Sequence, residues 1–257
     1  MKFPTIGNTC PLPASLNDHH HTMNFKGGVI IIGSLLWEDT PLRHKWKTMN
    51  LESVDTKRFV SVPIRYGRQS LTRSDTYTMI FSNHSSTQPG QAYILGFKEE
   101  IKNARILESQ AFALGAAEGF WTTESPSINK SWGTVGLLVN PNIDTKDKRN
   151  ADVVRNWWTQ LYQKYSETFN HSQYRIDDSE VPVIDKDGFL QIPWTNEMND
   201  FDFLIATPVV PKPKRLLTSK EIAEQMTAKN YRIYFDKNRE NNIQTFQDLE
   251  ILEHLNG

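Results

Sequence analysis

Cysteine is almost absent from this chain: Cys10 is the single one among 257 residues. One cysteine excludes a framework of internal disulfides and a zinc site built from cysteines alone. The formal net charge of −1 gives no field that would concentrate nucleic acid or an anionic membrane at the protein, so we expect neither as a partner. A long apolar segment is also missing. We therefore expect no signal peptide and no membrane span, and a cytoplasmic location is the default expectation.

The chain does contain enough apolar sequence for a substantial core. With 38% hydrophobic residues, it suffices for one large domain or a domain with an extension. We expect an N-terminal arm at 1–25, a domain at 26–143 and a C-terminal extension at 144–257 packed on that domain, divided where the sequence becomes charged and aperiodic. The arm contains the cluster His19-His20-His21 without a partner at a recognisable metal-ligand spacing. This favours a solvated polar arm over a metal site.

The most informative segment is an apolar run, residues 27–32, that leads into Gly33 and Ser34. A run of β-branched residues predicts a strand buried on both faces. Gly33 lets the backbone turn and approach another group closely. Successive backbone N–H groups in such a turn can converge on a carboxylate or an oxyanion. The alternative is a core strand that ends in an ordinary turn.

Other runs predict the remaining elements from their hydrophobic periodicity. We expect strands at 59–64, 77–81, 92–95, 133–139 and 201–210, and a turn at 185–188 that joins two short extended runs. We expect helices at 98–117 and 151–169, and two more that begin near residues 217 and 245. The helix at 151–169 carries a concentration of aromatic residues, which is expected to pack in the core.

Glu118 lies at the end of the helix predicted over 98–117, just before Gly119. A glycine in this place is typical of a left-handed C-cap. The helix macrodipole has its negative end there, so it disfavours the ionised form of the Glu118 carboxyl. Such a group suits acid/base chemistry. An ordinary surface glutamate beside a capping glycine is the alternative.

A polar segment, residues 65–70, separates two predicted strands. An arginine held between strands is costly unless its charge is paired. We therefore expect Arg65, Arg68 and Ser70 to line one cavity and to contact an anionic or polar ligand. The alternative is a structural arginine paired with Asp75 or with another carboxylate of the protein.

Several motifs occur in a fixed order along the first half of the chain. They are Gly33-Ser34-Leu35-Leu36-Trp37, the segment 62–70, the strand 76–81, Gly90-Gln91-Ala92-Tyr93, and Ala117-Glu118-Gly119. Together they resemble the γ-glutamylcyclotransferase-like superfamily over about residues 27–139. The tryptophan after the glycine-serine turn is most similar to the glutathione-degrading branch of that superfamily.

The resemblance implies an α+β fold, in which a small mixed β-barrel with flanking helices is followed by a C-terminal α/β extension. It implies an enzyme that converts a small-molecule γ-glutamyl amide or peptide to 5-oxoproline and a free amine, without a metal or an organic cofactor. Glu118 matches the family's catalytic glutamate, which would take a proton from the substrate and return it to the leaving amine. The residues Gly33, Ser34, Leu35 and Leu36 match the loop that binds the substrate.

The sequence departs from the family pattern at Ile32, where tyrosine is usual, and at Ala117, where many relatives have arginine. Glu108, on the same helix as Glu118, and Glu124 are alternative acid/base residues. Fold does not fix function. The competing class is therefore a non-catalytic small-molecule-binding protein that retains the fold.

Overall fold

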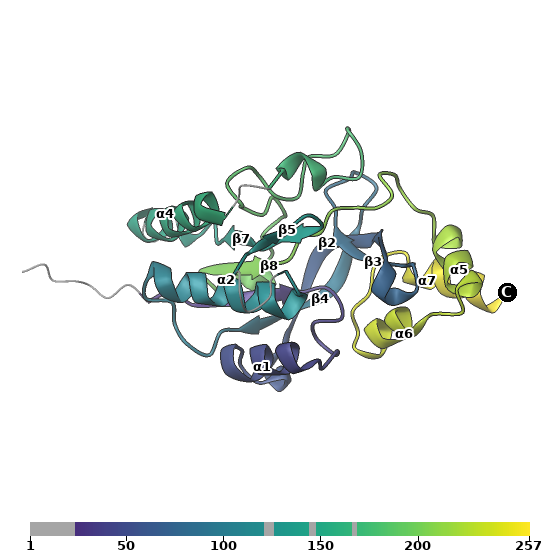
Figure 1. The fold of residues 1–257 in the computed structure, drawn as a ribbon, viewed down its shortest axis with the longest axis horizontal. Helices are drawn as coiled ribbons and strands as arrows, with labels where there is room; N and C mark the ends of the chain where they lie inside the picture. The colour runs from purple at the N-terminus through teal and green to yellow at the C-terminus, as the bar shows by residue number, and fades with distance from the viewer. Residues whose placement is uncertain (1–23, 121–125, 144–147, 166–168) are drawn as a thin grey trace, which may run out of the picture.

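A curled six-stranded sheet forms the centre of the molecule, with the strand order β3-β2-β4-β1-β8-β7 (Figure 1). The computed structural model describes residues 24–120, 126–143, 148–165 and 169–257. The strands of the sheet are β1 (Gly27–Ile31), β2 (Arg58–Ser70), β3 (Thr76–Phe81), β4 (Pro89–Gly96), β7 (Gly136–Val139) and β8 (Phe203–Ala206). A separate pair consists of β5 (Asn129–Lys130) and β6 (Gly133–Thr134). The fold is therefore mixed α+β, the class that the resemblance implies.

Helices are distributed between the two ends of the sheet (Figure 1). They are α1 (Pro41–Asn50), α2 (Ala104–Glu118), α4 (Lys148–Tyr165), α5 (Ser219–Ala228), α6 (Ile233–Glu240) and α7 (Asp248–Asn256). Helix α4 contacts β7 and α2, and α2 also contacts α1, whereas α5 contacts β3 and α7 at the opposite end. Short 3-10 turns are η1 (Val54–Thr56), η2 (Leu71–Arg73), η3 (His171–Gln173) and η4 (Asn196–Met198).

Strand β1 lies inside the sheet and is buried along its whole length. It pairs antiparallel with β4 and parallel with β8. Because both edges are paired and both faces are covered, the continuous apolar run is the sequence expected here. The prediction of a strand buried on both faces is confirmed.

Strand β2 is longer than the sequence predicts, because the polar segment 65–70 continues it. Its first half pairs with β4 and its second half pairs with β3, with a register shift between Tyr66 and Arg68. A bulge of this kind bends a strand and increases its twist. The bulge therefore contributes to the curl of the sheet, in which β2 pairs with both β4 and β3.

Helix α2 begins later than predicted and ends where predicted. The side chain of Asn103 accepts a hydrogen bond from the N–H of Ile106, so this N-cap fixes the start at Ala104. Residues 98–103 are not helical; within them Ile101 instead pairs with Phe25. At the other end, Gly119 has φ 79° and caps the helix in the left-handed conformation. Glu118 is thereby its last residue.

The aromatic side chains of α4 pack in the core, which confirms the prediction for this stripe. Trp158 and Tyr162 are fully buried, and Trp157 packs edge-on against Phe25. The indole N–H of Trp158 donates to the carbonyl of Gly188 at 2.9 Å. These contacts attach the helix to segments on both sides of it in the sequence.

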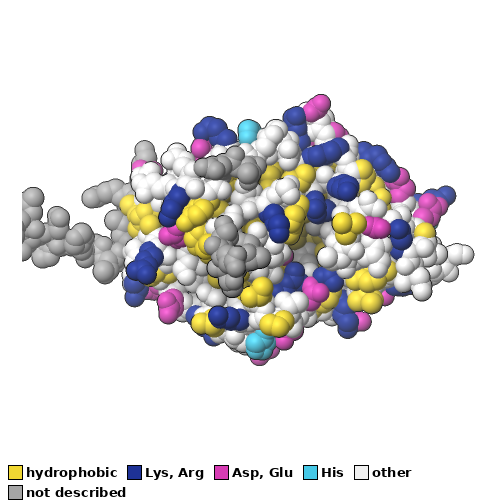
Figure 2. All heavy atoms as spheres, viewed as in Figure 1, with side chains coloured by type: hydrophobic (Ala, Val, Ile, Leu, Met, Phe, Trp, Pro, Cys, Tyr) yellow, Lys and Arg dark blue, Asp and Glu magenta, His cyan; other side chains and the backbone are white. Residues whose placement is uncertain are grey.

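The expected division at residue 143 does not coincide with a division of the sheet. Strand β8 comes from the segment expected to be an extension, yet it lies between β1 and β7 and pairs with both. Within the described residues, no helix is both long and apolar enough to cross a membrane. On the face shown in Figure 2, lysine and arginine side chains are scattered among acidic ones instead of gathering in one patch.

A buried carboxyl begins helix α7. Asp248 is 2% exposed, and its Oδ1 accepts hydrogen bonds from the N–H of Thr245 at 2.9 Å and from its hydroxyl at 2.6 Å. Its Oδ2 has no hydrogen-bond partner within the described part of the chain. Burial raises the pKa of the Asp248 carboxyl to about 6, and these hydrogen bonds only partly oppose that rise.

This raised pKa predicts a pH-dependent stability. In the unfolded chain the Asp248 carboxyl titrates near 3.9. Protonation therefore favours the folded state fully below about pH 4, and this contribution is lost as the pH rises through about 6. In chemical denaturation, Asp248→Asn should gain stability relative to the wild type between pH 4 and 7, by about 3 kcal/mol at most. If the two proteins differ in free energy of unfolding by the same amount at pH 4 and at pH 7, the prediction is wrong.

Candidate active site

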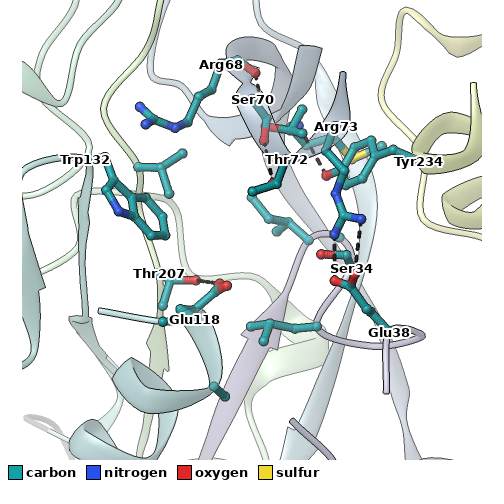
Figure 3. Close-up of a pocket in the computed structure, with 18 of the residues that line it drawn as sticks. Ser34, Glu38, Arg68, Ser70, Thr72, Arg73, Glu118, Trp132, Thr207 and Tyr234 are labelled. Carbon is teal, nitrogen blue, oxygen red and sulfur yellow. Dashed lines mark hydrogen bonds and ion pairs between the residues drawn. The ribbon is translucent and has the colours of Figure 1, made fainter. Parts of the chain in front are cut away.

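A pocket of about 650 Å³ opens where the turn after β1 meets the end of α2 (Figure 3). Its walls also come from the start of α1, from the second half of β2 with η2, from the segment after β8, and from α6. The pocket gathers six of the eight predicted site residues, namely Gly33, Ser34, Leu35, Arg68, Ser70 and Glu118. Leu36 and Arg65 are not among the residues that line it.

Three successive residues of the turn after β1, Gly33, Ser34 and Leu35, line the pocket. Within the turn, the N–H of Leu36 donates to the carbonyl of Gly33 at 3.1 Å, and that of Glu38 donates to Ser34 at 2.8 Å. Among the residues that the structure describes, the N–H groups of Gly33, Ser34 and Leu35 donate to no protein acceptor. Three successive donors are thus available to an anionic ligand. The N–H of Leu36 is not available to a ligand, because it already donates to Gly33. The Leu36 side chain is buried in the core.

A glycine is required at the first position of this turn because another element approaches it. A Cβ atom on residue 33 would lie 2.5 Å from the hydroxyl oxygen of Tyr234, which belongs to α6. The same hydroxyl accepts a hydrogen bond from the N–H of Met79 at 3.3 Å. Because residue 33 has no side chain, the Tyr234 hydroxyl of α6 can lie against the turn while it bonds to β3.

Glu118 ends α2 with its carboxyl turned into the pocket (Figure 3). The hydroxyl of Thr207 donates to Oε1 at 2.7 Å, and Nη2 of Arg43 lies 3.4 Å from Oε2. The side chain is 15% exposed. Burial raises the pKa of this carboxyl above its ordinary value, although Arg43 and the Thr207 hydrogen bond act in the opposite direction.

A second carboxyl in the pocket, that of Glu38, is held in the ionised form. Arg73 donates to its two oxygens at 3.1 and 2.6 Å, and Arg43 also contacts it. Burial would raise the pKa of Glu38, but the hydrogen bond from Arg73 and the charges of both arginines outweigh it, so the pKa lies below its ordinary value. Two carboxyls whose pKa values are pushed apart have different roles in acid/base chemistry. Glu118 is the one suited to exchange a proton.

Arg68 lies at another part of the pocket wall, beside Trp132. Its Nη1 donates to the carbonyl of Val210 at 2.6 Å, and its guanidinium lies 5.4 Å from the centroid of the Trp132 ring. Within the described residues, no carboxylate pairs with it. The hydroxyl oxygen of Ser70 lies 3.1 Å from that of Thr72, and both residues line the pocket.

The expectation that Arg65 shares this pocket is wrong. Its guanidinium is 5.6 Å from the Phe246 ring centroid, and Nη1 donates to the hydroxyls of Ser86 and Thr87 at 3.2 and 3.4 Å. The carbonyl of Leu217 accepts from its Nη2 at 3.3 Å. These neutral acceptors and the ring hold the charge of Arg65 away from the pocket. Asp75, the alternative carboxylate partner, pairs with Lys229 instead.

The structure places one of the two alternative glutamates, Glu108, away from the site. Glu108 lies between α2 and α4, where it accepts a hydrogen bond from the hydroxyl of Tyr165 at 3.2 Å. Glu124 lies outside the described residues. No three histidine, cysteine or acidic residues group as metal ligands in the described ranges. His19, His20 and His21 precede those ranges.

Among the pocket residues that sequence reasoning missed are Glu38, Arg43, Arg73, Thr207 and Tyr234, which come from elements far apart in the chain. Only one had a local signal. Thr40 followed by Pro41 is a typical helix start, which places Arg43 in the first turn of α1. No family model, curated protein or solved structure matches this chain, so the description of the site rests on its geometry.

The close approach at residue 33 gives a stability test. Gly33→Ala should destabilise the protein by about 1–3 kcal/mol, since the new methyl group overlaps the Tyr234 hydroxyl. Combining it with Tyr234→Phe removes the overlapping oxygen. In a double-mutant cycle by chemical denaturation, the pair should be more stable than the sum of the single changes predicts. Simple additivity would rule out this contact as the reason for the glycine.

Proposed function

We propose that this protein is a γ-glutamylcyclotransferase-like enzyme, which cyclises a γ-glutamyl amide or peptide to 5-oxoproline and releases the amine. One observation carries the proposal: Glu118 lines the same pocket as Gly33, Ser34 and Leu35, whose N–H groups donate to no acceptor among the described residues. The curled sheet would then be the barrel of that superfamily. The sequence motifs suggest this assignment, and the pocket brings residues from several of those motifs together.

In this reaction the α-ammonium group of the substrate must first lose a proton to become a nucleophile. The Glu118 carboxylate takes that proton, and the amine nitrogen attacks the γ-carbonyl carbon. As the five-membered ring forms, the bond from this carbon to the leaving nitrogen breaks. Two protons leave the attacking nitrogen in all, and Glu118 transfers them one at a time to the leaving amine. A carboxyl with a raised pKa can both accept and return protons near neutral pH.

The turn after β1 has two candidate tasks in this reaction. The N–H groups of Gly33, Ser34 and Leu35 can hold the α-carboxylate of the substrate or the oxyanion that forms at the γ-carbonyl. Such donors act without reorganisation because the turn is already closed by its own hydrogen bonds. Arg68 and Ser70, elsewhere on the wall, would contact the leaving part of the substrate.

Tyr234 compensates for the departure from the family pattern at Ile32. Ile32 lines the pocket but offers no hydroxyl, whereas the Tyr234 hydroxyl stands directly beside Gly33. In this proposal α6 supplies the hydroxyl that relatives have on the strand residue before the glycine.

A non-catalytic binding protein is the second candidate, and one observation favours it. Both oxygens of Glu118 already have protein partners, Thr207 and Arg43. A carboxyl that is fully committed to such contacts would shape a binding pocket without exchanging protons.

Glu118→Gln distinguishes the two candidates. The proposal predicts that release of 5-oxoproline from glutathione or a panel of γ-glutamyl compounds falls by a factor of about 10² to 10⁴. Affinity should change little, because glutamine keeps the shape of the side chain.

Glu108→Gln is the matched control, since it removes a carboxyl from the same helix outside the pocket. It should retain wild-type turnover. If the wild type binds a γ-glutamyl compound but releases no 5-oxoproline, the binding function is correct and the enzymatic one is wrong.

A further inference from the structure

The guanidinium of Arg43 contacts both the turn after β1 and the end of α2, two parts of the pocket wall. Arg43 donates from Nη1 to the hydroxyl of Ser34 at 3.0 Å, and the same nitrogen contacts Glu38. From Nε it donates to the carbonyl of Ala117 at 3.1 Å, and its Nη2 lies 3.4 Å from Glu118. Its side chain is 12% exposed. A single side chain thus bonds the turn after β1, the backbone at the end of α2, and the acid/base carboxyl.

The position of Arg43 within α1 does not explain why a positive charge is stable there. Arg43 lies in the first turn of α1, next to the positive end of the helix macrodipole, where a cation is unfavourable. The first turn of α1 contains no acidic side chain that would offset this cost. Lys47 lies in the last turn of α1, where the helix macrodipole stabilises a positive charge. The charge of Arg43 is therefore stabilised from outside α1, by the carboxylates of Glu38 and Glu118.

The geometry also separates the two carboxylates by how firmly Arg43 holds them. Glu38 is bound by Arg43 and by two hydrogen bonds from Arg73. The distance from Arg43 to Glu118 is 3.4 Å, longer than the 2.7–2.9 Å typical of a strong charge-assisted hydrogen bond. Glu118 can therefore lose its attraction to Arg43 while Arg43 stays in place through its other three contacts.

We propose that Arg43 is the positioning residue of Glu118: it aims the carboxyl at the turn after β1 and keeps it ionised until the substrate ammonium gives up a proton. This role rests on the proposed function, because it assigns Glu118 as the proton acceptor. The fixed guanidinium provides the charge against which the carboxyl gains and loses its proton in each turnover.

The charged and titratable groups around Glu118 fix the expected direction of change. Arg43 and Arg73 favour the ionised carboxylate, whereas Glu38 disfavours it, and Tyr234 stays neutral near neutral pH because burial raises its pKa. Thr207 also favours the ionised form through its hydrogen bond. Without Arg43, burial and the charge of Glu38 face fewer opposing groups. The pKa of Glu118 should then rise further.

The test compares Arg43→Met and Arg43→Lys with Lys45→Met, which removes a charge from an exposed position of the same helix. The pKa of Glu118 is read directly from the ¹³C resonance of its carboxyl during a pH titration, with Glu118→Gln identifying the signal. The acidic limb of kcat/KM for release of 5-oxoproline is measured on the same proteins. Circular dichroism verifies that each variant is folded.

In Arg43→Met we expect both the carboxyl titration and the acidic limb to move up by about one pH unit or more, with turnover at pH 7 reduced about tenfold or more. Arg43→Lys keeps the positive charge, so the Glu118 carboxyl should titrate closer to its wild-type pH in this variant. Lysine cannot make all of the contacts of arginine, so turnover should still be slow. Lys45→Met should behave as the wild type.

An unchanged carboxyl titration in a folded Arg43→Met variant overturns the proposal, and so does an unchanged turnover in both Arg43 variants. The NMR titration needs no substrate. If the wild type forms no 5-oxoproline, the proposed function fails, while the titration still decides whether Arg43 holds Glu118 in its ionised form.

Discussion

The pocket depends on a cluster of four charges, Glu38, Arg43, Arg73 and Glu118, that is largely removed from water. Removing charges from water is costly unless each finds a partner in good geometry. The cluster therefore requires that the turn after β1, α1, η2 and the end of α2 come together at once. Its balance also gives the two carboxyls opposite pKa shifts, because Glu38 receives more of the positive charge than Glu118 does. The same ion pairs thus stabilise the site and distinguish its two carboxyls.

The parallel pairing of β1 with β8 brings the last component to this cluster. Thr207 follows β8 directly and donates to Glu118, although 89 positions of sequence separate the two residues. Since β8 lies between β1 and β7, the segment that ends at Thr207 cannot move independently of the turn after β1. The second half of the chain is in this way part of the site, and α6 adds Tyr234 to the same wall.

The sequence predicted those parts of the site that have local signals. An apolar run before Gly33 and a capping glycine after Glu118 each reflect backbone requirements of one segment, and both were found where predicted. The partners of Glu118 could not be predicted, because pairing across the fold leaves no pattern within one segment. Arg65 shows the converse error. Its charge suggested a ligand, whereas hydroxyls, a carbonyl and the Phe246 ring accommodate it, and none of these is recognisable from the residues beside it.

Of the two tasks proposed for the N–H groups of Gly33, Ser34 and Leu35, binding of the substrate α-carboxylate can be tested without turnover, because 5-oxoproline keeps that carboxylate. A ¹H–¹⁵N correlation titration with 5-oxoproline tests this most directly. We expect the amide signals of Gly33, Ser34 and Leu35 to shift downfield and to saturate together, as new hydrogen bonds to a carboxylate form. The amide of Leu36, which already donates to Gly33, should move least. Saturable shifts elsewhere in the protein, with these three amides unaffected, would contradict the account.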